Sequence, residues 1–220
     1  GSLEMPSPGY TSVRELEGAV KASTLSEADL NARAAEVAKI AHLTKTEGVG
    51  RNDLLKDAVA AAHHEIARKV AENSSVLLKN ASATLPLQSG TCVAVIGDMA
   101  KTPRFQGSGS SKVNATREEN ILDELKNAAA TTGVTVAGYA QGYDRQGAKN
   151  QTLIDEAKTL AAADTTDAVI AVVGLDERSE SEGLDRSTMA IPQVQNDLVD
   201  ALTATGKPVI VVLVAGSPVE

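Results

Sequence analysis

The fold is decided by Asp167-Ala-Val-Ile-Ala-Val-Val173 and by the stretch that follows it, Gly174-Leu-Asp-Glu-Arg-Ser-Glu-Ser-Glu-Gly-Leu-Asp-Arg186. The first part is a continuous apolar run, which is typical of a buried β-strand. The second part carries five carboxylates and two arginines. Ligands of open α/β sheets bind at the carboxyl edge of the strands, so this loop is a candidate site. Crowding predicts that at least one carboxyl has a raised pKa, as a general acid requires; a solvated acidic loop is the alternative.

Apolar runs at 92–97, 134–139, 167–174 and 209–214 alternate with helical patterns. This alternation predicts the α/β class, with an open, mainly parallel sheet sandwiched by helices in three αβα layers. Residues 11–80 show only helical patterns, so a helical segment is expected before the sheet. Two capping-box patterns predict helix starts within the chain, at Ser26 and at Thr116. The third helical pattern runs from about residue 52 to residue 78.

Composition excludes several classes of partner. The net charge of −8 argues against nucleic acid, whose phosphates require a basic face. No apolar run reaches the roughly 18 residues that span a bilayer, so no membrane partner is expected. A lone cysteine, Cys92, allows no disulfide framework and does not indicate the compartment. His63 and His64 are adjacent on a predicted helix and point about 100° apart, so no metal site is expected there.

A set of short motifs follows one order along almost the whole chain. The motifs are Leu3-Glu-Met-Pro6, Leu25-Ser-Glu-Ala-Asp-Leu30, Ser75-Val-Leu-Leu-Lys-Asn80, Leu85-Pro-Leu87, Val95-Ile-Gly97, Gln106-Gly-Ser-Gly-Ser-Ser111, Tyr139-Ala-Gln-Gly142, Glu182-Gly-Leu-Asp-Arg186, Ile191-Pro192-Gln193 and Gly216-Ser-Pro218. Each motif alone has little specificity. As an ordered set they resemble glycoside hydrolase family 3, the family of β-glucosidases and related exo-acting enzymes.

The resemblance implies an (α/β)8 barrel followed by an (α/β)6 sandwich, with the active site between them. Residues 1–45 would be the tail of the barrel, 46–88 a linker with a helix, and 89–220 a sandwich that is incomplete at its C-terminus. The implied reaction is retaining hydrolysis of terminal β-linked sugars by two carboxylates, without a cofactor. The family's nucleophilic Asp lies upstream of the Leu-Glu-Met-Pro motif, so we expect it to be absent here.

Three expectations follow from that absence. The isolated chain should be inactive. Its partners should be a β-linked glucoside or oligosaccharide and the remaining segments of the same enzyme. A non-catalytic carbohydrate-binding or interaction module derived from the family is the alternative function.

For the general acid and base, the resemblance favours Glu182, whose neighbour Gly183 lets the backbone approach a sugar closely. Glu180 and Glu177 remain alternatives, because this loop varies in length across the family. The other site residues that it implies are Met5, Arg104, Phe105 and Arg186 for sugar binding, and Gly107, Gly109, Ser110 and Asp185 for loop structure.

Asp185 and Arg186 are expected to form a pair that fixes the loop. The Gly107–Ser111 loop is not expected to bind phosphate, because Lys112 is followed by Val113 rather than by Ser or Thr.

Overall fold

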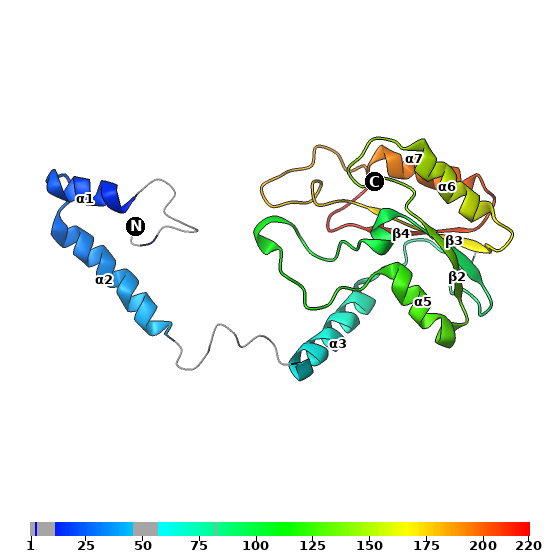
Figure 1. The fold of residues 1–220 in the computed structure, drawn as a ribbon, viewed down its shortest axis with the longest axis horizontal. Coiled ribbons are helices and arrows are strands. Elements are labelled where there is room, and N and C mark those ends of the chain that lie inside the picture. Colours follow the sequence, from blue (N-terminus) through cyan, green and yellow to red (C-terminus); the bar gives the residue numbers. More distant parts are fainter. Residues whose placement is uncertain (1–2, 4–11, 46–56, 82) are drawn as a thin grey trace. The chain divides into compact units, whose positions relative to one another are not determined.

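The computed structural model describes residues 3, 12–45, 57–81 and 83–220 of the chain (Figure 1). The chain divides into two compact units, Gly1–Val70 and Ala71–Glu220. The division into barrel tail, linker and sandwich stays a prediction. Met5 lies outside the described residues.

The described residues of the first unit form helices and short connections. The helices are α1 (Val13–Lys21), α2 (Glu27–Leu43) and the larger part of α3 (Asp57–Ser74). Ser26 caps α2 as predicted, since its hydroxyl accepts a hydrogen bond from the Asp29 backbone N–H at 3.0 Å. The predicted third helix is too long at its C-terminal end, because α3 stops at Ser74. Neither α1 nor α2 has a buried residue. Across the described ranges, no helix has the length and apolar character needed to cross a bilayer.

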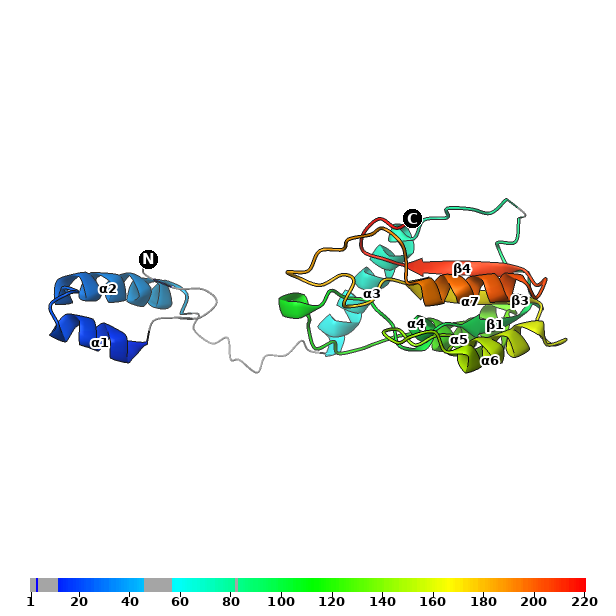
Figure 2. The ribbon, with the colours of Figure 1, turned by 90° about the horizontal axis from the view of Figure 1, so that it is seen from above.

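The second unit is built around four parallel strands in the order β2-β1-β3-β4. Its elements are β1 (Cys92–Ile96), α4 (Asp98–Lys101), the short 3-10 helix η1 (Gly109–Ser111), α5 (Ile121–Thr132), β2 (Thr135–Ala140), α6 (Gln151–Ala162), β3 (Ala168–Gly174), α7 (Gln193–Thr203) and β4 (Val209–Val214). The predicted α/β class with an open parallel sheet is confirmed. Figure 2 shows β4 at the edge of this sheet.

One predicted helix start is wrong. Thr116 does not cap a helix; α5 begins at Ile121, where the Asn120 side chain accepts a hydrogen bond from the Asp123 backbone N–H at 2.8 Å. Asparagine is among the strongest N-capping residues, so a cap four residues farther along takes the place of the predicted box.

The sheet is covered on both faces. In β3, which is buried throughout, Val169, Ala171 and Val173 belong to a core that includes residues of α6 and α7. The alternate residues Ala168 and Ile170 belong to a second core with residues of α4 and α5. Figure 1 shows α6 and α7 side by side over one face and α5 over the other. Because a strand's side chains alternate between faces, a strand buried on both sides must be apolar throughout, as the sequence indicates.

The strand order creates a switch point between β1 and β3. From β1 the chain crosses to β2 on one side, and from β3 it crosses to β4 on the other, so the loops after β1 and β3 diverge and leave a crevice. Gly174 ends β3 at φ +155°, where an added Cβ would lie 1.9 Å from the carbonyl oxygen of Val214. Its backbone N–H donates to Oε1 of the buried Gln195 at 2.7 Å. This bond fixes the start of the loop at residues 174–186, which we call the acidic loop, against α7.

Candidate active site

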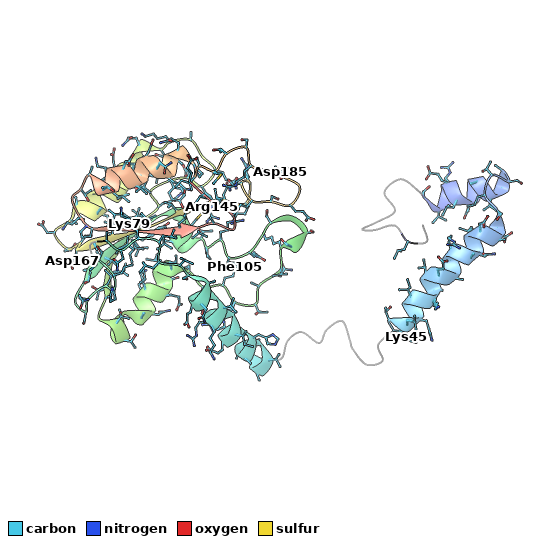
Figure 3. All side chains as sticks on the ribbon, turned by 180° about the vertical axis from the view of Figure 1, so that it is seen from behind. Lys45, Lys79, Phe105, Arg145, Asp167 and Asp185 are labelled. Carbon is cyan, nitrogen blue, oxygen red and sulfur yellow. The ribbon has the colours of Figure 1, made fainter. Side chains whose placement is uncertain are left out.

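Two loops meet at the switch point. The acidic loop follows β3, and the Gly/Ser loop (residues 106–111) comes from the segment between β1 and α5. Ser108 forms a parallel bridge with Ser181 of the acidic loop, and the Ser108 hydroxyl donates to the carbonyl oxygen of Glu177 at 3.1 Å. Figure 3 shows Phe105, Arg145 and Asp185 at one end of the sheet and Asp167 at the other. The carboxyl edge therefore gathers the predicted site loops.

Glu180 lies in a partly buried, ion-paired cluster, which we call the Glu180 clamp (Arg104, Glu180, Gly216 and Ser217). Nη1 of Arg104 lies 2.5 Å from the Glu180 carboxylate, and the two side chains are 9% and 12% exposed. The Gly216 backbone N–H donates to the same carboxylate at 3.0 Å, and the Ser217 hydroxyl donates as well. The clamp therefore joins loops that follow β1, β3 and β4.

The clamp determines the ionisation of Glu180. Burial alone raises the pKa of its carboxyl, but the hydrogen bonds from Ser217, Gly216 and Arg104, with the Arg104 charge, together outweigh burial. The net result is a pKa below the ordinary value, so Glu180 stays ionised.

Glu177 is held by an arginine that the sequence analysis did not identify. Nη1 of Arg145 lies 2.9 Å from Glu177, and Nε of Arg145 lies 2.7 Å from Asp98. Arg145 also donates to the carbonyl oxygen of Thr102. Arg145 follows β2 at the carboxyl edge of the sheet. Because ligands of open α/β sheets bind at this edge, the argument that identified the acidic loop could also have identified Arg145. The guanidinium fixes Glu177 to the segment after β1.

Glu182 is exposed and contacts the Gly/Ser loop. Its Oε2 accepts hydrogen bonds from the Ser110 hydroxyl and from the Ser110 backbone N–H, the latter at 3.2 Å. These two bonds lower the pKa of Glu182 below its ordinary value, and burial opposes them only slightly. The expectation that crowding raises a pKa in this loop is thus wrong at Glu180 and Glu182, because hydrogen-bond donors from other loops lower both pKa values and outweigh the effect of burial.

The expected pair between Asp185 and Arg186 does not form. Arg186 donates instead to the carbonyl oxygen of Pro218 at 2.6 Å, while Asp185 is exposed. Residues 185 and 186 lie in an irregular part of the loop, where adjacency in the sequence does not set the directions of the two side chains. Arg186 therefore fastens the acidic loop to the segment after β4.

A cavity of about 1050 Å³ opens beside the Glu180 clamp, between the loops that follow β1, β3 and β4. Its lining includes all three described residues that were expected to bind sugar, Arg104, Phe105 and Arg186, and Phe105 is 52% exposed. Glu182 does not line this cavity. Where the structure describes side chains, no group of three or more His, Cys, Asp or Glu could hold a metal ion.

The second unit is thus an α/β domain that presents carboxylates and a cavity at the switch point of a parallel sheet. Residues 75–220 match the family model of the glycosyl hydrolase family 3 C-terminal domain, and the chain belongs to this family.

Relatives of known name support the same assignment. The chain is 38% identical over 219 residues to thermostable beta-glucosidase B of Acetivibrio thermocellus, a match that covers 99% of this chain. It is 34% identical to an exo-alpha-(1->6)-L-arabinopyranosidase of Bifidobacterium breve, covering 98% of this chain. The chain spans 28% of the length of each relative. The crystal structure of a Bifidobacterium adolescentis GH3 beta-glucosidase matches with a TM-score of 0.70 and 34% identity, covering 100% of this chain and 31% of that chain.

Proposed function

We propose that this chain is part of a retaining, exo-acting β-glycosidase of the β-glucosidase type, and that Glu182 is its general acid and base. In a retaining reaction, one carboxylate attacks the anomeric carbon while the other protonates the oxygen of the leaving group. The second carboxylate then takes a proton from the attacking water. The nucleophile in this proposal is an Asp of the barrel portion, about 5–5.5 Å from Glu182.

We choose Glu182 because of the interaction partners of the three candidate carboxylates. Within the described chain, the Glu182 carboxylate forms no ion pair and bonds only to Ser110, whereas Glu180 is paired with Arg104 and Glu177 is paired with Arg145. A general acid changes its protonation state in every turnover. An arginine pairs with each of the other two glutamates and ties it to a neighbouring loop, which leaves Glu182 as the carboxylate best placed to meet a substrate.

The lowered pKa of Glu182 belongs to an exposed side chain. In the proposed active site, the barrel would cover Glu182 and bring a second carboxylate close to it. Loss of solvent and repulsion between like charges both raise a carboxyl pKa, which is the direction that a general acid requires. The isolated chain lacks that environment, so it should be inactive.

The proposed substrate is a β-linked glucoside or oligosaccharide with a terminal sugar. The cavity at the carboxyl edge supplies the outer part of its site, with the exposed Phe105 ring as an apolar surface and Arg186 at the polar side. The relatives are named for different sugars, a glucosidase and an arabinopyranosidase, so the identity of the sugar is left to experiment.

A chimera tests this function. Residues 1–220 replace the matching stretch of the Acetivibrio enzyme, and hydrolysis of an alkyl β-glucoside, whose leaving group must be protonated, is measured for the chimera and for E182Q, E180Q and E177Q. Loss of general acid–base catalysis predicts that E182Q lowers kcat/KM about 10²–10⁴-fold, and the other two variants much less. Near-normal activity of E182Q, or equal losses in all three variants, would contradict the assignment of Glu182.

A further inference from the structure

Ser110 bonds to one oxygen of Glu182 through two of its own groups. Its hydroxyl and its backbone N–H both donate to Oε2 of Glu182, across a separation of 72 residues in the sequence. The backbone N–H can only donate. The hydroxyl can donate to Oε2 whether or not the other carboxyl oxygen carries a proton.

The Gly/Ser loop is shaped around this contact. We call Ser108, Gly109 and Ser110 the Glu182 cradle. The bridge between Ser108 and Ser181 aligns the cradle with the acidic loop one residue before Glu182. Gly109 has φ +75°, which favours glycine, and an added Cβ would lie 3.3 Å from Cβ of Glu182. A side chain at position 109 would therefore crowd Glu182.

We propose that Ser110 is the positioning residue for Glu182, holding Oε2 in place in both protonation states of the carboxyl group. This role rests on the proposed function of Glu182. The Ser110 hydroxyl donates to Oε2 both when Glu182 is ionised and when Glu182 carries its proton on Oε1, so that proton stays available for the leaving group. Ser110 gains and loses no proton in either half of the reaction.

Ser110 is also the main described group that acts on the ionisation of Glu182. No charged side chain contributes a resolved effect to the Glu182 pKa in the described chain; Ser110 lowers it through two hydrogen bonds, and slight burial raises it. Removing the Ser110 hydroxyl leaves the backbone N–H in place. The pKa of Glu182 should then rise, because one of its two donors is lost.

The first test needs no activity. The side-chain carboxyl of Glu182 is titrated by carbon-13 NMR in the 220-residue chain, with E182Q identifying its signal. S110A should raise the Glu182 pKa, and S110T, which keeps a hydroxyl, should restore it. S111A is the matched control, because the neighbouring hydroxyl donates to the carbonyl oxygen of Ser108 at 3.1 Å instead of to Glu182. An unchanged Glu182 pKa in S110A, or equal shifts in S110A and S111A, would overturn the proposed role.

The second test uses the active chimera. S110A should lower kcat on the order of tenfold with little change in KM, and should move the alkaline limb of the pH–rate profile upward, with S110T close to the parent. If S110A shifts the NMR titration but leaves kcat and the alkaline limb unchanged, the positioning role is refuted while Glu182 keeps its role. If E182Q itself is fully active, the proposed function fails independently of the titration.

Discussion

Breaking the Glu180 clamp should destabilise the sheet unit strongly. Arg104→Met removes the largely buried guanidinium, whose side chain is 9% exposed, and leaves Glu180 with the donors of Gly216 and Ser217. Removing one partner of a buried ion pair costs about 3–5 kcal/mol. Because two donors remain, we expect a loss at the lower end, about 3 kcal/mol in the free energy of unfolding. For a domain of this size, this loss corresponds to a fall in Tm of roughly 6–12 °C.

Urea unfolding followed by far-UV circular dichroism measures this loss, since the chain has no Trp to serve as a fluorescent probe. Arg117→Ala is the control. Arg117 pairs with Glu119 at the surface, where its side chain is 62% exposed, so its loss should cost less than about 1 kcal/mol.

The double variant R104M/E180M separates the ion pair from simple loss of packing. Replacing both members of a buried pair by apolar residues is far less costly than removing one of them. The loss in the free energy of unfolding in the double variant should therefore be smaller than the sum of the losses in the two single variants, by roughly 1–3 kcal/mol. Additive losses in the cycle, or a loss in R104M no larger than that in R117A, would refute the stabilising role of the clamp.

Three further predictions concern the same unit. The Glu180 carboxyl has a pKa below its ordinary 4.5, so its stabilising effect is complete above about pH 4.5 and is lost as the pH falls through the folded-state pKa. E180Q should therefore flatten the decline of the urea midpoint in that acidic range. Parallel declines in E180Q and the parent would contradict this. Gly174→Ala should cost about 1–3 kcal/mol more than Gly206→Ala in urea unfolding, because the new Cβ at Gly174 meets the Val214 carbonyl, whereas Gly206, at φ +80°, has open space around its Cβ position. Equal losses would argue against the close approach of β3 and β4. Leu198→Ala should lower the free energy of unfolding by about 2–5 kcal/mol, because it leaves a cavity at a fully buried position. A Tm within 1–2 °C of the parent, roughly the effect of a surface substitution, would contradict the burial of Leu198.

The fold could be predicted because its signals are local. A run such as 167–173 that is apolar at every position indicates a strand buried on both faces, and alternation with helical patterns indicates a parallel sheet. The strand order is not a local property, so the switch point between β1 and β3 came only from the structure. The error at Thr116 arose because two possible N-caps, Thr116 and Asn120, lie only four residues apart, and local sequence does not show which one starts the helix.

The site could be located but not resolved from the sequence. The acidic loop and the Gly/Ser loop were both singled out, yet the contacts that distinguish the glutamates join residues far apart in the chain. Arg104 and Glu180 are 76 residues apart, and Arg145 and Glu177 are 32 apart. The expected pairing of Asp185 with Arg186 failed because adjacency in sequence does not set the direction of side chains in an irregular loop.

The assignment of Glu182 is best decided by chemical rescue in the chimera. E182A is assayed on a dinitrophenyl β-glucoside, whose leaving group needs no proton, and on an alkyl β-glucoside, whose leaving group does, each with and without azide. If Glu182 is the acid and base, E182A keeps its glycosylation step on the dinitrophenyl substrate, loses the alkyl substrate, and forms β-glucosyl azide with faster turnover when azide is present. Equal losses on both substrates, with no effect of azide, would contradict that role.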